Sequence, residues 1–215
     1  MKTILCYGDS NTYGYIPGTG GRYDHKTRWP MALERILNEG AVEAEWWVDE
    51  EGLCGRTSCF DDPVELQRNG LRHVVPILKS HKPLDIAAVM LGTNDLKRRF
   101  NPSPYDVAQG VLNLVKAVQN SETGPGDGPP LVLVICPPPL QDSPVFGDIF
   151  RGSAALSAHL PRFYAEICAE SGATFFDAGA VVNVSPADGI HIGAESHLRL
   201  AEAVADIVRG MVRGG

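Results

Sequence analysis

Two segments of the chain, residues 86–91 and 131–135, are apolar at every position rather than at every second one. A strand with one face in water alternates apolar and polar side chains, whereas a strand that is covered on both faces can be apolar throughout. Strands of the second kind occur in parallel sheets that have helices packed on both sides. The two segments therefore predict a parallel sheet within an α/β fold.

Strands and helices are expected to alternate along the rest of the chain. Ser103 is typical of a helix N-cap, because Pro104 follows at the first helical position and an acid at the third. The last helix is expected to pack on the sheet through apolar residues at helical spacing, namely Leu200, Val204, Ile207 and Met211. Strands are expected at residues 2–7, 44–49, 84–91, 131–136 and 173–177.

This alternation predicts a doubly wound, three-layer α/β/α sandwich. The chain has 215 residues, which is enough for one such domain with a sizeable core, and we expect a single domain over residues 1–215. Residues 121–130 are rich in glycine and proline, and they are few enough to form a surface loop between a helix and a strand.

Charge and composition limit the partners and the location. The formal net charge of −7 at pH 7 argues against nucleic acid, because phosphate binding requires a clustered basic surface. The dense basic cluster at residues 97–99 is interpreted as a solvated loop. No apolar segment reaches the ~18–20 residues of a membrane span, and no export signal precedes Asp9, so we expect a cytoplasmic protein without a membrane partner. The odd number of cysteines favours free thiols, and no metal site is expected.

Several candidate site residues follow the ends of expected strands. Ser10 follows the first strand, Gly55 the second and Asn94 the third. Asp188 and His191 lie beyond the fifth. Alone, each has an ordinary interpretation, such as a helix cap or a turn residue. Ligands of doubly wound folds bind at the carboxyl ends of the strands, near the point where the strand order reverses, so together they predict one site.

The residue types at this edge are those of an activated nucleophile. A serine hydroxyl needs a base within hydrogen-bond reach, and His191 is the candidate base for Ser10. Asp188 can hold the other ring nitrogen and stabilise the imidazolium that forms. The backbone N–H groups of Ser10 and Gly55 and the side-chain amide of Asn94 are candidates for the oxyanion hole. The set predicts an acyl-transfer site.

The remaining acids and histidines near these motifs are given structural roles. Asp9 adjoins Ser10, but neighbouring side chains on a loop usually diverge, so we expect Asp9 to brace the loop through backbone N–H groups. Asp95 is expected to do the same. The other histidines lack a partner motif and are interpreted as surface or helix residues: His25, His73, His81, His159 and His197.

Four short blocks of the chain resemble one known family. The blocks are residues 8–10, Gly55, residues 92–95 and residues 188–191, and they resemble those of the SGNH hydrolases, also called GDSL-type esterases and lipases. The finer match is similar to the bacterial arylesterase/acyltransferase branch. The resemblance implies a flavodoxin-like five-stranded parallel sheet of order 2-1-3-4-5, no cofactor, and a homo-oligomer, with an octamer as one form.

The chain departs from the family pattern beside the nucleophile. Asn11 stands where the signature has leucine, and we expect this change to be tolerated because the position does no chemistry. Tyr13 and Tyr15 stand where close members of the branch have tryptophans, which alters the aromatic wall near Ser10. The apolar stretch 137–152 is interpreted as a pocket lip or a subunit contact.

The expected activity is that of a serine esterase acting on a small-molecule ester. It would hydrolyse short-chain and aryl esters through an acyl-enzyme on Ser10 and also transfer the acyl group to alcohols, with substrate bound by Tyr13, Tyr15, Phe150 and Ile190. One alternative is a carbohydrate acetylesterase of the same superfamily. Another is a flavodoxin-like module whose loop at residues 8–12 binds a phosphate or a flavin.

Overall fold

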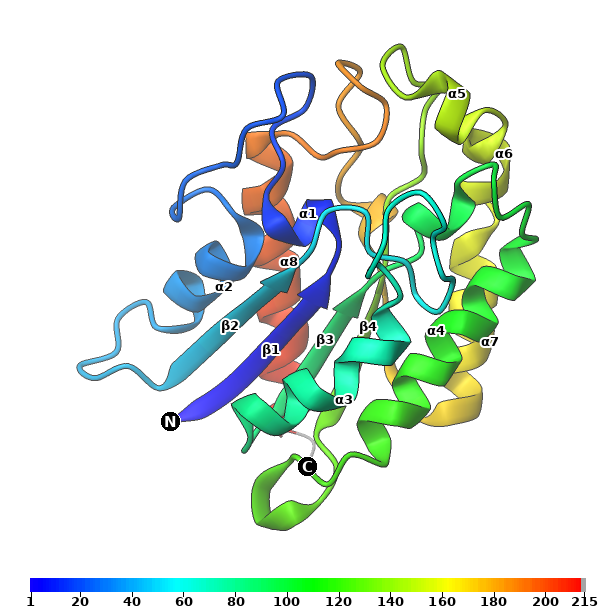
Figure 1. The fold of residues 1–215 in the computed structure, drawn as a ribbon. Helices are drawn as coiled ribbons and strands as arrows, with labels where there is room; N and C mark the ends of the chain where they lie inside the picture. The colour runs from blue at the N-terminus through cyan, green and yellow to red at the C-terminus, as the bar shows by residue number, and fades with distance from the viewer. Residues whose placement is uncertain (214–215) are drawn as a thin grey trace.

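A computed structural model describes residues 1–213 of the chain and contains a five-stranded parallel sheet. The strand order β2-β1-β3-β4-β5 confirms the expected order 2-1-3-4-5 (Figure 1). The first strand, expected at residues 2–7, begins and ends within one residue of the observed β1. The strands are β1 (Lys2–Gly8), β2 (Trp46–Gly52), β3 (Ile86–Met90), β4 (Leu131–Cys136) and β5 (Thr174–Asp177).

Helices cover both faces of the sheet, as the unbroken apolar strands predict. One face carries α2 (Trp29–Leu37) and α8 (Ala194–Arg213), and these two helices also contact each other. The other face carries α3 (Gly70–His81), α4 (Pro104–Gln119) and α7 (Leu160–Ser171). The shorter helices are α1 (Ser10–Tyr13), α5 (Gly147–Phe150) and α6 (Ser153–Ser157), with 3-10 turns at Asn94–Leu96, Pro125–Asp127 and Ala178–Ala180.

Strand β1 shows why a central strand of this fold contains no polar alternation. Ile4 and Cys6 belong to the core under α2 and α8, whereas Leu5 and Tyr7 belong to the core under α3, α4 and α7. All four side chains are buried. Successive side chains of a strand point to opposite faces, and here both faces are covered, so every position has to be apolar.

The second strand lies two to three residues further along the chain than expected. We expected residues 44–49, but β2 spans Trp46–Gly52 and includes three consecutive acids, 49–51. Acids are poor strand formers, yet β2 is an edge strand that pairs only with β1. Glu50 is also neutralised there by Arg28, whose Nε donates a hydrogen bond of 2.8 Å to it. Tertiary contacts thus outweigh local propensity.

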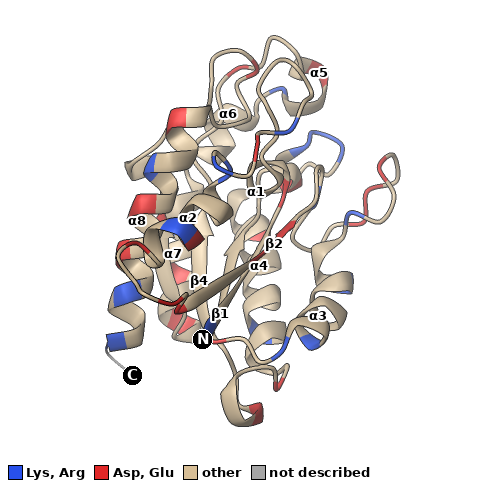
Figure 2. Cartoon of the chain, turned by 90° about the vertical axis from the view of Figure 1, so that its left-hand side faces the viewer, with Lys and Arg blue, Asp and Glu red and all other residues tan. Residues whose placement is uncertain are grey.

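The two helix predictions made from caps and periodicity are confirmed. Ser103 caps α4 by accepting a hydrogen bond from Asp106 N, and the Asp106 side chain in turn accepts from Ser103 N. In α8, Leu200 and Val204 are fully buried, and Ile207 and Met211 are partly buried against the same core. Acidic and basic residues are distributed along the rest of α8 (Figure 2). None of the helices in residues 1–213 is long and apolar enough to cross a membrane.

The stretch 137–152 packs over the carboxyl ends of the strands on its own chain. The carbonyl of Ile149 accepts a hydrogen bond of 2.8 Å from Arg98 N. At the next helix, Ser153 Oγ donates a hydrogen bond of 2.6 Å to the carbonyl of Leu96. These contacts fix α5 beside the 3-10 turn at Asn94–Leu96, and Figure 1 shows α5 and α1 at the same end of the sheet. The segment is therefore part of the wall around that end.

Candidate active site

Ser10 is held at the carboxyl end of β1 by close backbone packing. Asp9 is the N-cap of α1, and its Oδ1 accepts a hydrogen bond of 2.9 Å from Asn11 N. Helix α1 presses on the end of β2, because a Cβ atom at Gly52 would lie 2.1 Å from Tyr13 N. Only glycine permits that approach. The first turn of α1, and Ser10 with it, is thereby fixed above the sheet.

Ser10, His191 and Asp188 form a continuous hydrogen-bonded series. The distance from His191 Nε2 to Ser10 Oγ is 2.9 Å, and that from His191 Nδ1 to Asp188 Oδ2 is 2.8 Å. All three residues are buried, Asp188 completely. This is the arrangement of hydroxyl, imidazole and carboxylate that an activated serine requires. The structure therefore brings together three residues that the sequence predicted to share one site.

Asp188 is held in its charged form by the loop that also carries His191. Its Oδ1 accepts hydrogen bonds of 3.0 Å from both Ile190 N and His191 N. Burial alone would raise the pKa of Asp188, but the hydrogen bonds from the His191 side chain and from these two N–H groups outweigh burial and lower it. An ionised carboxylate at this position keeps a proton on His191 Nδ1 and leaves Nε2 free to accept one.

Two aromatic rings hold the imidazole of His191 in place. Tyr15 stacks on it with ring centroids 4.1 Å apart, and Phe146 meets it edge-on with centroids 5.9 Å apart. Such contacts restrict the ring orientation and favour an imidazolium when one forms. The expected aromatic wall thus includes Tyr15, together with Phe146 from the stretch 137–152. Phe146 was not singled out from the sequence as a substrate-binding residue.

Three hydrogen-bond donors are available beside Ser10 for a developing oxyanion. Among residues 1–213, neither Ser10 N nor Gly55 N donates to another group of the protein. Gly55 has a φ of 82°, a backbone conformation that favours glycine, and a Cβ there would lie 2.4 Å from Glu65 Oε2. Asn94 Nδ2 donates one hydrogen bond of 3.3 Å to Asp9 Oδ2, which orients the amide and leaves its second N–H free.

Asp9 and Asp95 are buried acids that brace the loops around the site. Asp95 accepts hydrogen bonds from the backbone N–H and the hydroxyl of Ser58. Burial raises the pKa of Asp9 to about 6, against the opposing effect of the Asn11 N–H. Burial likewise raises the pKa of Asp95 to about 6, although the hydrogen bonds from Ser58 oppose it. The bracing geometry agrees with the expectation from the sequence, and it includes the Asn94 side chain as well.

The site opens into a pocket of about 190 Å³. Of the four expected substrate-binding residues, Tyr15, Phe150 and Ile190 line this pocket. Tyr13 does not line the pocket, and its ring lies 4.3 Å from the guanidinium of Arg22 instead. A tyrosine at that position therefore does not alter the pocket wall directly.

The charged wall of the pocket was missed by the sequence interpretation. Lys97 was assigned to a solvated basic loop, but its side chain is 3% exposed and lines the pocket. Its Nζ lies 3.1 Å from Asp62 Oδ2 and 2.8 Å from Glu65 Oε1. Arg99 also pairs with Asp62, at 2.8 Å. The solvated-loop interpretation is therefore wrong for Lys97, because acids more than thirty residues earlier in the chain fold back over it, whereas Arg98 and Arg99 are exposed.

Asn11 also has a role that the sequence interpretation did not assign. Its Oδ1 accepts a hydrogen bond of 2.9 Å from Ile192 N, and its Nδ2 donates one of 3.4 Å to the carbonyl of Ile190. The side chain thus bonds to the backbone on both sides of His191. Leucine, which the family pattern has here, could make neither hydrogen bond, so the position contributes to holding the site together.

The other groups considered from the sequence lie outside this constellation. His197 is fully buried in α8, and its Nδ1 accepts a hydrogen bond of 3.3 Å from Trp29 N. Burial, reinforced by the charges of Arg28 and His191, lowers the pKa of His197 to about 3. It is a neutral core residue. In the part of the chain that the structure describes, no group of three or more His, Cys, Asp or Glu side chains is arranged to hold a metal ion.

Comparisons with known proteins agree with this geometry. The chain matches the model of the GDSL-like Lipase/Acylhydrolase family over residues 6–199. An aryl esterase from M. smegmatis is 38% identical, with a TM-score of 0.91, and the match covers 98% of this chain and 99% of that chain. No curated protein sequence matches the chain.

A second solved structure is equally similar to the chain. A carbohydrate acetylesterase from Sinorhizobium meliloti is 37% identical, with a TM-score of 0.91, and the match covers 98% of this chain and 100% of that chain. Both similarities extend over nearly the full length, and the family model spans both the Ser10 and the His191 motifs. The chain therefore belongs to the GDSL-like lipase/acylhydrolase family of SGNH hydrolases and is a carboxylic ester hydrolase.

Proposed function

We propose that this protein hydrolyses short-chain and aryl carboxylic esters through an acyl-enzyme on Ser10. The observation that carries the proposal is the series from Asp188 through His191 to Ser10, with hydrogen-bond distances of 2.8 and 2.9 Å. The small volume of the pocket, about 190 Å³, supports small substrates, because pockets for drug-sized ligands occupy roughly 300–1,000 Å³.

The proposed reaction has two steps. Ser10 Oγ attacks the ester carbonyl carbon while His191 Nε2 takes the hydroxyl proton, and the carbonyl oxygen becomes an oxyanion held by Ser10 N, Gly55 N and Asn94 Nδ2. The bond to the leaving alcohol then breaks, and His191 gives its proton to that alcohol. A water molecule, deprotonated by His191, then attacks the acyl-enzyme carbonyl. The bond to Ser10 Oγ breaks, His191 returns the proton to Ser10 Oγ, and the acid is released.

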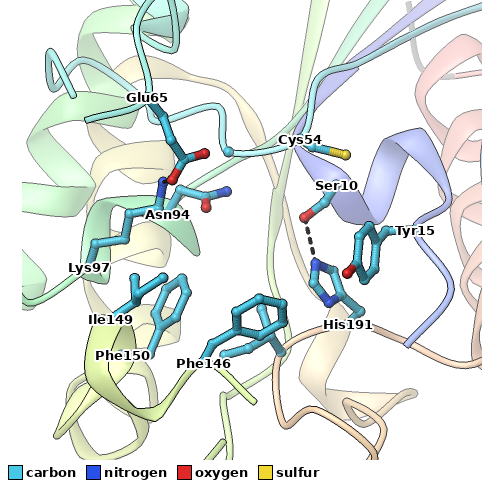
Figure 3. A pocket seen from close by; sticks show the side chains of 12 residues that line it. Ser10, Tyr15, Cys54, Glu65, Asn94, Lys97, Phe146, Ile149, Phe150 and His191 are labelled. Atoms are coloured by element: carbon cyan, nitrogen blue, oxygen red, sulfur yellow. Dashed lines mark hydrogen bonds and ion pairs between the residues drawn. The ribbon is translucent and has the colours of Figure 1, made fainter. Parts of the chain in front are cut away.

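Acyl transfer to an alcohol would use the same intermediate. Phe146, Ile149 and Phe150 form an apolar side of the pocket, which favours the binding of an organic alcohol over water at the acyl-enzyme (Figure 3). We expect a mixture of an acyl donor ester and a primary alcohol to give some of the new ester as well as the acid. Chromatography of the products measures the ratio, and a reaction that forms acid alone contradicts this part of the proposal.

A second candidate function is carbohydrate acetyl ester hydrolysis. It is favoured by the ion pair of Lys97 and Glu65 in the pocket wall, which could bind sugar hydroxyls, and by the likeness to the Sinorhizobium meliloti enzyme. Rates on acetylated sugars and on p-nitrophenyl acetate separate the two. A phosphate- or flavin-binding module would leave Asn94, Asp188 and His191 without a role, and Thr12 of the candidate phosphate loop is fully buried.

Labelling with a serine-directed phosphonate tests the assignment of the nucleophile. We expect mass mapping to find the label on Ser10, and we expect Ser10→Ala to lose both the label and several orders of magnitude in kcat. His191→Ala should be labelled far more slowly. Ser80→Ala is a matched control, because Ser80 is an exposed serine on α3 whose hydroxyl bonds only within its own helix region. Near-normal hydrolysis by Ser10→Ala would exclude this mechanism.

A further inference from the structure

Part of the pocket wall that faces His191 is ionic. Figure 3 shows Glu65 and Lys97 beside Asn94, on the side of the pocket opposite His191 and Tyr15. The Lys97 ammonium is almost completely withdrawn from solvent, whereas the Glu65 side chain is 37% exposed. A buried lysine is retained in a site only with partners for its charge, and these partners are supplied by Asp62 and Glu65.

The four ion-paired groups of the wall carry no net charge among themselves. Lys97 and Arg99 supply two positive charges, and Asp62 and Glu65 supply two negative ones, all within one set of ion pairs. Asp62 stays ionised because hydrogen bonds from Val64 N, Glu65 N and Lys97 hold its pKa at about 2 against the effect of burial. These four charges cancel, and the Arg68 guanidinium, whose Nε lies 3.2 Å from the place that a Cβ of Gly55 would occupy, lies beside them without an ion pair among the described residues.

The wall does offer one free donor and one free acceptor. Lys97 Nζ has three N–H groups, and two of them are used on Asp62 and Glu65. Glu65 uses Oε1 for Lys97, and among the described residues its Oε2 accepts no hydrogen bond. A hydroxyl group can donate to a carboxylate and accept from an ammonium at the same time. It is the smallest neutral group that satisfies both.

The free acceptor lies next to the proposed oxyanion hole. Glu65 Oε2 is 2.4 Å from the place that a Cβ of Gly55 would occupy. If Gly55 N holds the carbonyl oxygen of the substrate, a group that reaches Glu65 Oε2 lies close to the ester group. We infer that Glu65 and Lys97 form a hydroxyl-binding subsite, and that the preferred substrates are esters with a hydroxyl group on a carbon close to the ester group.

This inference rests on the proposed esterase function and adds a substrate class to it. In the free protein, water can satisfy the donor and the acceptor. A substrate hydroxyl reproduces those hydrogen bonds when it displaces the water, whereas a methyl group at the same place leaves both groups unpaired. The hydroxyl can belong to the acyl part or to the alcohol part of the ester, and two pairs of probes distinguish these cases.

Isosteric pairs of esters provide the test. Ethyl glycolate is compared with ethyl propanoate for the acyl part, and 2-hydroxyethyl acetate with n-propyl acetate for the alcohol part. Because a nearby hydroxyl also raises the intrinsic reactivity of an ester, each ratio is compared with that for alkaline hydrolysis of the same pair. We expect kcat/KM to favour the hydroxylated member of at least one pair by roughly tenfold beyond that reference, as a hydrogen bond to a charged group allows. Ratios equal to the reference in both pairs would overturn the inference.

Variants of Glu65 show whether the preference comes from this subsite. We expect Glu65→Gln, which replaces the free acceptor by a donor, to bring the ratio close to that for alkaline hydrolysis of the same pair. Glu65→Asp keeps the negative charge but moves the carboxylate away from the pocket, so it should also lower the ratio. Thermal melting checks that both variants are folded. Asp61→Asn removes a carboxylate of the same loop that pairs with Arg72 outside the pocket, so it should keep the wild-type ratio.

The possible outcomes distinguish failure of the hydroxyl-binding subsite from failure of the proposed esterase function. A ratio that survives in both Glu65 variants overturns the hydroxyl subsite while leaving the esterase intact. A wild-type protein that hydrolyses none of the four esters and no p-nitrophenyl acetate overturns the proposed function itself.

Discussion

Asn11 joins two segments of the site that are far apart in the sequence. It lies next to Ser10, and its hydrogen-bond partner Ile192 is 181 positions further along the chain. The side chain is 2% exposed, so its polar atoms have no solvent to replace these partners. Its two hydrogen bonds to the backbone around His191 keep the imidazole at a fixed distance from the serine hydroxyl.

Replacement of Asn11 should therefore impair catalysis more than substrate binding. Asn11→Leu introduces the residue of the family pattern but leaves Ile192 N and the Ile190 carbonyl buried without partners. We expect kcat on p-nitrophenyl acetate to fall by roughly 10–100-fold with a much smaller change in KM, because a misplaced base slows proton transfer. Asn11→Asp keeps the acceptor for Ile192 N and should lose less. An unchanged kcat in Asn11→Leu would show that the loop carrying His191 keeps its position without the hydrogen bonds from Asn11.

At this scale the sequence predicts which residues lie at the same edge of the sheet, but it does not predict which side chains pair with one another. Ser10, Gly55 and Asn94 could be assigned to one edge because each follows a strand of the parallel sheet, and the structure places all three around one pocket. The burial of Lys97 could not be predicted. It depends on Asp62 and Glu65, 35 and 32 positions away, and a basic run carries no sign of which acids will cover it.

Among the secondary-structure elements, those with strong local signals were predicted best. Helix α4 has its cap, its proline and its apolar spacing all within one segment, and it begins where the sequence indicated. Strand β2 is displaced from its expected position because its acids are made acceptable by an edge position and by arginines elsewhere in the chain. Local sequence patterns predict the bounds of an element when local interactions stabilise it, and they fail when contacts with distant residues determine where it begins and ends.

The start of α4 gives a prediction about stability. Ser103→Ala removes the side chain that accepts from Asp106 N and breaks the reciprocal capping box. Loss of an N-cap typically costs about 1 kcal/mol, which corresponds to a decrease in Tm of about 2–4 °C for a chain of this size. Ser80→Ala, on the exposed part of α3, should leave Tm unchanged. Calorimetry measures both, and equal Tm values would show that α4 is held by packing alone.

Over the whole molecule, the site concentrates buried carboxylates at the carboxyl edge of the sheet. Asp9 and Asp95 have pKa values raised to about 6 by burial, whereas Asp62 has a pKa lowered to about 2 by its hydrogen bonds against burial. The raised groups bind protons more tightly in the folded state, so their contribution to the free energy of unfolding is greatest below about pH 4 and falls as pH rises through 6. Asp62 has the opposite effect, because its contribution is present above about pH 4 and is lost as pH falls towards 2.

Asp9→Asn should therefore lower kcat and raise the free energy of unfolding, and the gain in stability should be larger at high pH than at low pH. Each pKa unit corresponds to about 1.4 kcal/mol, so removal of the carboxylate can raise the free energy of unfolding by up to about 3 kcal/mol at pH 8, with a much smaller gain at pH 4. An amide at this position can still accept from Asn11 N, but it no longer provides a second acceptor for Asn94 Nδ2, so kcat should fall by tenfold or more.

Urea unfolding at pH 4 and pH 8 measures the change in the free energy of unfolding. Asp142→Asn, which replaces an exposed carboxylate, is the control. A stability change that is the same at pH 4 and pH 8 would mean that Asp9 is not the group that titrates, and that the buried charge beside Ser10 does not weaken the fold.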